Sequence, residues 1–106
     1  MTKKQTFGKL NKFEWDEGNA TKNYLKHKVT QYECEEVFSN NPLVLKDATH
    51  SQKEERFLAW GKTNKKTVLT IAHTIRNNKI RVISARPASR KERKDYEKNI
   101  KDRSRI

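Results

Sequence analysis

The stretch from Thr67 to Arg86, TVLTIAHTIRNNKIRVISAR, constrains the fold of this chain more than any other. Its two halves, Thr67–Arg76 and Lys79–Ala85, are rich in threonine, valine and isoleucine, which is typical of β-strands. Asn77-Asn78 between them predicts a tight turn, because asparagine tolerates a positive φ better than most residues. The stretch therefore predicts a β-hairpin.

The register of this hairpin separates its side chains into two faces. Opposed residues share a face, and successive residues alternate between faces. The turn pairs Arg76 with Lys79, Thr74 with Arg81 and His73 with Val82. One face then carries apolar side chains and one histidine, at Leu69, Ile71, His73, Ile75, Ile80 and Val82. The other face carries cations and hydroxyl groups, at Thr70, Thr74, Arg76, Lys79 and Arg81, which predicts a core on one side and a cationic surface on the other.

Arg86 does not fit this division. In an unbroken strand it has the parity of the core face, opposite to that of Arg76 and Arg81. A β-bulge, which is an extra residue in one strand, would turn Arg86 to the cationic face. If a site on that face needs all three arginines, the sequence predicts a break in the strand near Ala85–Pro87.

The segment before the hairpin alternates between strand and helix signals. Phe13–Asp16 alternates large apolar and acidic residues, as a short edge strand does. Asp16 is expected to cap a helix over residues 17–26. Thr30 and Glu33 have the spacing of a capping box, which opens a second helix that ends before Pro42.

Two more strands, Leu43–Leu45 and Arg56–Trp60, are expected before the hairpin, and a basic helix after it begins at the capping-box spacing of Ser89 and Glu92. Short connections between strands predict an antiparallel meander. The expected class is α+β: a small antiparallel β-sheet meander with two N-terminal helices packed on one face and a C-terminal basic helix. Three glycines and two prolines provide no linker, so residues 1–106 are expected to form a single domain with loose ends at 1–12 and 101–106.

The charge of the chain favours an anionic partner. The formal net charge is +12, and residues 79–106 hold eleven Lys and Arg against four Asp and Glu. Such a surface favours nucleic acid or an acidic protein, with a generic solubilising charge as the alternative. The single cysteine, Cys34, excludes an intramolecular disulfide and fits a reducing cytosol. Without an apolar run of ~18 residues or a signal-peptide pattern, the expected localisation is cytoplasmic.

The histidines do not form a metal-binding pattern. His27, His50 and His73 are far apart in the sequence, so neither a metal nor another cofactor is expected. His73 falls on the predicted core face, where a buried, hydrogen-bonded histidine is the favoured interpretation.

The arginines are more informative than the histidines. Four of them lie in or at the ends of the expected strands: Arg56, Arg76, Arg81 and Arg86. A guanidinium suits bidentate phosphate contacts and the dispersed charge of a phosphoryl transition state. Taken singly, each arginine is better explained by a surface salt bridge. Taken with Thr74, Lys79 and the basic C-terminal helix, they are at least as well explained by a nucleic-acid-binding surface.

Short motifs follow one another along the chain in an order that is specific as a set: Phe13-Glu14-Trp15-Asp16, Lys26-His27, Val37-Phe38, Glu54-Glu55-Arg56 and Ile80-Arg81-Val82-Ile83-Ser84-Ala85-Arg86. With Pro42, Gly61, Glu92 and Tyr96 they resemble the BrnT toxin family over residues 13–97. The resemblance implies an endoribonuclease toxin with a RelE-like fold, from a bacterial or phage type II toxin–antitoxin module. It also implies a cognate BrnA-like antitoxin, a two-plus-two heterotetramer, and operator DNA bound through the antitoxin to repress the module's own promoter.

Metal-independent RNA cleavage uses the 2′-hydroxyl as the internal nucleophile, so the protein supplies positioning, charge stabilisation and proton transfer. His27, with Lys26 beside it, is the first candidate for proton transfer, followed by Glu55 and Tyr96. The expected catalytic set is His27, Lys26, Glu55, Arg76, Arg86 and Tyr96. The expected RNA-binding set is Arg56, Lys79, Arg81 and Thr74.

Two positions depart from the family pattern, and two other functions stay open. Lys28 stands where a glycine often follows the Lys26-His27 pair, and His73 stands where an aromatic or aliphatic residue is usual. The alternatives are a basic module that binds nucleic acid or an acidic partner without cleavage, and a degenerate toxin that retains only antitoxin binding.

Overall fold

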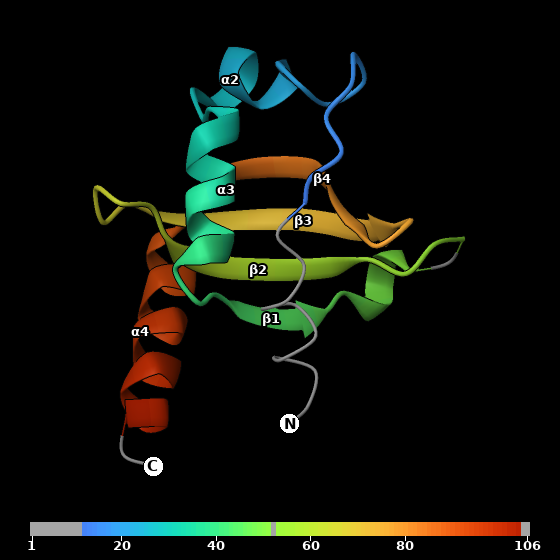
Figure 1. Cartoon of the computed structure of the whole chain (residues 1–106). Coiled ribbons are helices and arrows are strands. Elements are labelled where there is room, and N and C mark those ends of the chain that lie inside the picture. The colour runs from blue at the N-terminus through green and yellow to red at the C-terminus, as the bar shows by residue number, and fades with distance from the viewer. Residues whose placement is uncertain (1–11, 52, 105–106) are drawn as a thin grey trace.

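The computed structural model describes residues 12–51 and 53–104, so residues 1–11 and 105–106 of the loose ends expected at 1–12 and 101–106 lie outside the described residues. In the described residues, three helices, four strands and one 3₁₀ turn follow one another (Figure 1): α2 Lys22–His27, α3 Gln31–Ser39, β1 Leu43–Lys46, η1 Ala48–His50, β2 Phe57–Lys62, β3 Val68–Arg76, β4 Lys79–Pro87 and α4 Arg90–Ser104. The strands form one antiparallel sheet in the order β1-β2-β3-β4. The expected α+β meander is confirmed.

The hairpin has the predicted turn and register. Asn77 and Asn78 have φ angles of 51° and 62°. Two consecutive positive φ values define the turn type whose twist matches the flanking strands. Arg76 lies opposite Lys79, and Thr74 lies opposite Arg81. The turn and the pairs next to it therefore agree with what the two asparagines predict.

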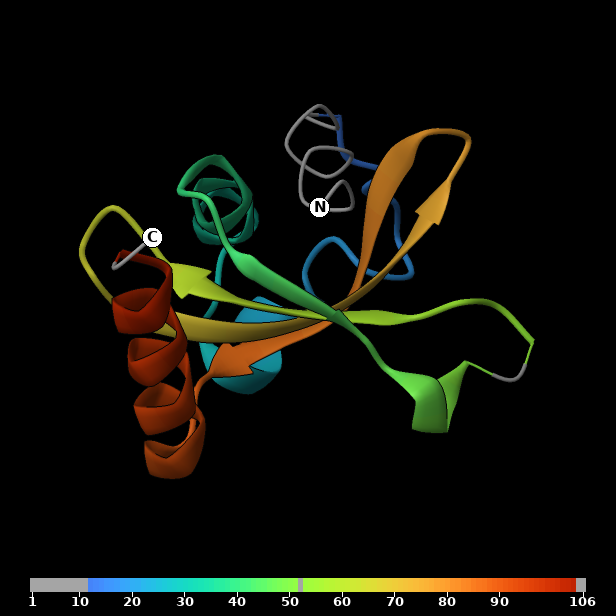
Figure 2. The same cartoon turned by 90° about the horizontal axis from the view of Figure 1, so that it is seen from below.

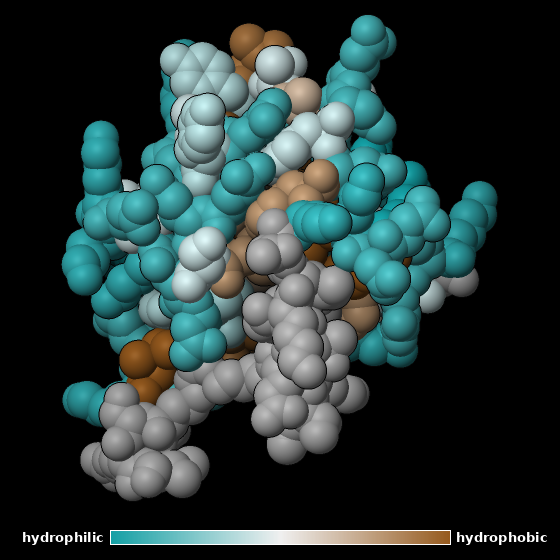
Figure 3. Space-filling view, viewed as in Figure 1, coloured by the Kyte–Doolittle hydropathy of each residue, from teal (hydrophilic) through white to brown (hydrophobic). Residues whose placement is uncertain are grey.

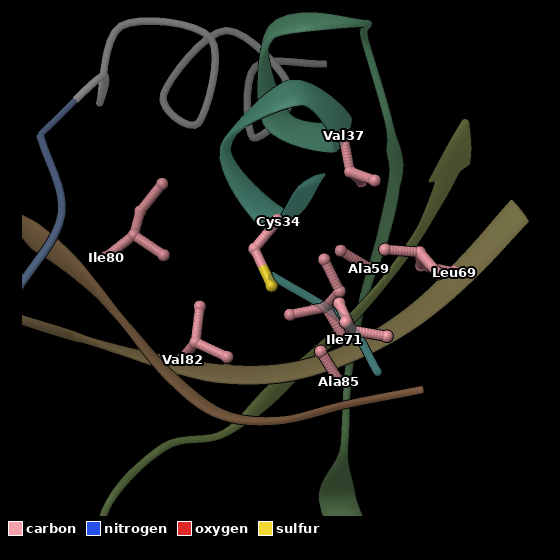
Figure 4. Close-up of a cluster of buried hydrophobic side chains, with 9 residues drawn as sticks. Cys34, Val37, Ala59, Leu69, Ile71, Ile80, Val82 and Ala85 are labelled. Atoms are coloured by element: carbon pink, nitrogen blue, oxygen red, sulfur yellow. The ribbon is translucent and has the colours of Figure 1, made fainter. Parts of the chain in front are cut away.

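Helix α3 covers one face of the sheet and supplies the main core (Figure 4). Cys34 and Val37 point from α3 toward Ile71 of β3 and Val82 of β4, and all four side chains are at most 1% exposed. The helix comes so close to β2 that a Cβ atom on Gly61 would lie 2.8 Å from Val37 Cγ1. Glycine at this position therefore sets the distance between α3 and the sheet.

The opposite face, called here the second face, is partly covered by α4. Figure 2 shows α3 above the sheet and the start of α4 below it. A second apolar cluster joins α4 to this face through Val68, Ala88 and Tyr96, with Leu43, Trp60 and Ile100 packed against it. The expectation that this whole face is a solvent-facing cationic surface is therefore wrong at the α4 end. The expected loose tail is also wrong for residues 101–104, because α4 continues to Ser104.

The N-terminal segment runs along the outer edge of β4. The strand expected at Phe13–Asp16 is a single parallel bridge between Phe13 and Ile80. The helix expected over residues 17–26 begins only at Lys22. The Asp16 side chain accepts a hydrogen bond from the backbone N–H of Gly18 at 2.8 Å, so it stabilises a local turn instead of capping the helix.

Both capping boxes are present. The Thr30 hydroxyl accepts from the Glu33 backbone N–H, and the Glu33 carboxylate accepts from the Thr30 backbone N–H. The same reciprocal pair joins Ser89 and Glu92. These side chains satisfy N–H groups that have no partner within the first turn of a helix.

Candidate active site

A β-bulge in β4 determines which way Arg86 points. His73 lies opposite Val82, whereas the preceding residue of β3, Ala72, lies opposite Ser84. Ile83 is therefore an extra residue, and the side chains after it change face. Ala85 is buried in the α3 core, and Arg86 lies opposite Thr70 on the second face. The predicted break exists, but it lies at Ile83 and not at Ala85–Pro87.

The bulge places three arginines in one row on the second face. Arg76 lies at the hairpin tip, Arg81 two cross-strand pairs further, and Arg86 opposite Thr70 near α4. Six residues of β3 separate Arg76 from Thr70, which corresponds to about 20 Å along the strand. The two ends of the row are too far apart to contact one phosphate, and they suit different phosphates of one extended strand.

Each arginine of the row is held by a carboxylate. Arg76 Nε lies 2.7 Å from Glu54, Arg81 Nη1 lies 2.8 Å from Asp16, and Arg86 Nη1 lies 2.8 Å from Glu92. These hydrogen bonds lower the pKa of Glu54 and Asp16 and raise the pKa of the three guanidinium groups. A guanidinium has five N–H donors, so two bonds to a carboxylate fix its plane and leave other donors for a phosphate.

The pair between Arg86 and Glu92 belongs to a larger network. The Glu92 carboxylate accepts two hydrogen bonds from Arg86, one from the Ser89 backbone N–H at 2.8 Å and one from the Thr70 hydroxyl at 3.0 Å. The Arg86 bonds are the main cause that lowers the pKa of Glu92 from 4.5 to about 2. The network ties Arg86 to both β3 and the start of α4.

Helix α2 lies beyond the β4 edge, beside the Arg86 end of the row (Figures 1 and 2). The buried Asn23 side chain accepts a hydrogen bond from the Ala85 backbone N–H at 2.9 Å. His27 follows Asn23 by four residues and so lies on the same side of α2. His27 is half-buried, and the adjacent Lys26 is exposed. Arg86, His27 and Lys26 therefore belong to one end of the molecule.

The remaining predicted residues lie elsewhere. Glu55 is exposed before β2 and forms an ion pair with Lys46 at 3.1 Å, at the hairpin end of the sheet. Arg56 lines a pocket of about 390 Å³ at that end, and Lys79 is exposed at the hairpin tip. Tyr96 is only 5% exposed and packs in the α4 cluster. The structure thus divides the expected catalytic set between two ends of the sheet.

The two threonines expected on the cationic surface are buried. Thr74 is 1% exposed and donates a hydrogen bond to the Glu55 carbonyl at 2.7 Å, and Thr70 is 4% exposed. The expected RNA contact of Thr74 conflicts with this geometry, because the loop before β2 covers its hydroxyl. Both threonines instead join the sheet to neighbouring segments.

His73 is a core residue, as its position in the hairpin predicts. It is fully buried, stacks on Phe57 with 5.7 Å between ring centroids, and meets the edge of Phe38 at 4.9 Å. Burial lowers its pKa from 6.5 to about 4. It is therefore neutral at pH 7 and has no role at the arginine row.

The carboxylates that hold the arginines are the residues that sequence reasoning missed. Only Glu92 carries a local signal, the capping-box spacing with Ser89. Glu54 and Asp16 lie 22 and 65 residues from their partners, and no local pattern connects them. Within residues 12–51 and 53–104, no group of three or more His, Cys, Asp or Glu side chains is placed to hold a metal ion. In the same part of the chain, no helix has both the length and the apolar character needed to cross a membrane.

The fold and the arginine row define a small α+β protein with three carboxylate-paired arginines on one face of its sheet. Over residues 15–92 the chain matches the family described as "Ribonuclease toxin, BrnT, of type II toxin-antitoxin system", and it belongs to this family. It is thus a ribonuclease toxin by family, a class that acts on RNA and has an antitoxin as its partner.

A solved structure supports the same fold. The crystal structure of the ribonuclease toxin BrnT from Brucella abortus is similar with a TM-score of 0.56 and 24% sequence identity, covering 74% of this chain and 97% of that chain. A comparison with curated protein sequences gives no match.

Proposed function

We propose that this protein is a metal-independent endoribonuclease that cleaves single-stranded RNA lying across the second face of its sheet. The observation that carries this proposal is the bulge at Ile83, which turns Arg86 to the face of Arg76 and Arg81. The row supports binding of several successive phosphates, since guanidinium groups bind phosphate in a bidentate manner. Arg56 and Lys79 extend the positive surface at the hairpin end.

The cleavage step takes place at the Arg86 end of the row. The 2′-oxygen attacks the adjacent phosphorus, its proton passes to the imidazole of His27, and the bond from phosphorus to the 5′-oxygen breaks. Lys26 protonates that oxygen, which leaves a 2′,3′-cyclic phosphate and a 5′-hydroxyl. Arg86, held by Glu92, offsets the charge that develops on the phosphoryl oxygens. Glu55 and Tyr96 have no part in this step, because one lies at the other end and the other is buried.

The family match supports a biological setting that we include in the proposal. A BrnA-like antitoxin neutralises the toxin in a two-plus-two heterotetramer, and the complex binds operator DNA through the antitoxin. The proposed location is the cytoplasm, where the cell's RNA is found. Growth arrest on expression, with rescue by co-expression of the protein encoded next to the toxin gene, tests this setting. An absence of arrest from a stably folded toxin contradicts it.

The chemistry is tested with a fluorescently labelled single-stranded RNA and purified protein. His27→Ala and Lys26→Ala are expected to reduce cleavage by about 100-fold or more, since general acid–base groups contribute this much. His50→Ala, in the η1 turn, and Lys22→Ala, also on α2, are the matched controls and keep wild-type rates. Equal rates for His27→Ala and His50→Ala, with both variants folded, would refute the assignment.

A further inference from the structure

A second basic site lies on the far side of α4 from Glu92. A groove of about 600 Å³ separates the β2–β3 turn from the first turns of α4. Lys62 at the end of β2 and Lys66 in the turn line one side of it, and Arg90, Arg93, Lys94 and Glu97 line it from the helix. It therefore combines five cationic side chains with one carboxylate. Figure 3 shows hydrophilic side chains over the β2–β3 turn, at the left of the view.

Backbone hydrogen bonds fix both walls of this groove. The Ala88 N–H donates to the Val68 carbonyl at 2.9 Å, which joins the start of α4 to β3. In the turn, the buried Thr63 accepts from the backbone N–H groups of Lys66 and Thr67. The cations are thus carried on a preformed scaffold, so binding an anion requires little ordering of the backbone.

The groove differs from the arginine row in its charge balance. The arginines of the row are each held by a carboxylate, whereas none of the ion pairs between described residues uses a groove cation. Arg90, Arg93 and Lys94 occupy one face of α4 at positions i, i+3 and i+4, where like charges repel. An anion in the groove relieves this repulsion.

We infer that this groove binds the sugar-phosphate backbone of the RNA substrate outside the point of cleavage, an inference that rests on the proposed function. Its lining includes Pro87, the residue next to Arg86, so one wall of the groove begins directly after the arginine row in the chain. The lining residues, all in the described part of the chain, include no aromatic side chain on which a base could stack. The contact is therefore with phosphates and is independent of base sequence.

The test uses a 20-nucleotide all-2′-O-methyl RNA, which cannot be cleaved because its nucleophile is blocked. Binding is measured as a function of salt for the wild type and for the triple variant Lys66→Gln/Arg93→Gln/Lys94→Gln. The matched control is Lys65→Gln/Lys91→Gln/Lys101→Gln, which removes the same charge from the same two elements outside the groove. We expect the groove variant to bind about tenfold more weakly, with a salt slope reduced by about 2, since each phosphate contact on a single strand contributes ~0.7.

The outcomes separate this inference from the proposed function. If the groove variant binds the RNA more weakly and the control variant does not, the result supports RNA binding in the groove, whether or not the wild type cleaves unmodified RNA. Equal losses in both triple variants show a general charge effect and overturn the inference. Unchanged RNA binding combined with a weakened complex with the antitoxin also overturns it, because the groove would then bind an acidic protein segment. Thermal unfolding of each variant shows that it is folded.

Discussion

The substitution Glu92→Gln tests the network that positions Arg86. The side chains have the same shape, so the Gln oxygen can still accept from the Ser89 N–H and the Thr70 hydroxyl. The Gln amide nitrogen, however, replaces the oxygen that lies 2.9 Å from Arg86 Nη2. Two donor groups then face each other, and the ionic part of the pair is lost.

The magnitude follows from the pKa of Glu92, which the folded protein lowers from 4.5 to about 2. Without solvent screening, a shift of this size would contribute about 3 kcal/mol to the free energy of unfolding, since one pKa unit equals ~1.36 kcal/mol. The Arg86 side chain is 44% exposed, so solvent screening reduces the contribution to about 1–2 kcal/mol. We expect Glu92→Gln to lower the free energy of unfolding by that amount at pH 7.

The pH dependence has a definite sign. Because the folded state lowers the pKa of Glu92, its contribution is present above pH 4.5 and is lost as the pH falls toward 2. Urea denaturation of the wild type and of Glu92→Gln, between pH 7 and pH 3, measures the difference directly. Glu97→Gln, which removes an exposed carboxylate from the same helix, is the control. A difference between wild type and Glu92→Gln that is equally large at pH 3 and pH 7 would refute the reasoning.

Three further predictions concern stability. Gly61→Ala puts a Cβ atom 2.8 Å from Val37 Cγ1, so it is expected to destabilise the protein by about 1–3 kcal/mol in urea denaturation, with partial recovery in combination with Val37→Ala. Lys28→Gly is expected to raise the thermal midpoint, because Lys28 ends α2 with a φ of 61°, where a side chain costs about 1 kcal/mol; an unchanged or lower midpoint contradicts this. Burial lowers the pKa of His73 to about 4, so as the pH falls the unfolded state binds a proton before the folded state does. The free energy of unfolding is therefore expected to fall by about 3 kcal/mol between pH 6.5 and pH 4. This loss should be absent from a folded His73→Phe variant.

The parts of the fold that depend on neighbouring residues were predictable from the sequence. Asn77 and Asn78 specify the turn, and alternation along the strands then specifies which hairpin residues reach the core. The capping boxes at Thr30 and Ser89 mark where two helices begin, since both partners are three residues apart. In each case the determining contact is local.

The rest depends on contacts between distant segments. Alternation indicates that Arg86 needs a bulge to reach the cationic face, but no local signal marks its position at Ile83; after the bulge, the Ala85 N–H donates to Asn23, a residue 62 positions away in the chain. The burial of Thr74 follows from a loop that crosses it, and the neutralisation of Arg81 follows from an aspartate 65 residues away. No periodicity or motif spacing in the sequence indicates these features.

If the bulge makes Arg86 and Arg76 act on one RNA strand, with cleavage at the Arg86 end, substitutions of the two arginines must affect different kinetic constants. Steady-state cleavage of a labelled single-stranded RNA by Arg86→Ala and Arg76→Ala measures this difference. Arg86→Ala is expected to lower kcat by about 100- to 1,000-fold, because it removes transition-state charge stabilisation. Arg76→Ala is expected to raise KM and leave kcat nearly unchanged, because it removes a binding contact. Unchanged cleavage by a folded Arg86→Ala variant, or a loss of kcat with Arg76→Ala instead, would contradict the claim.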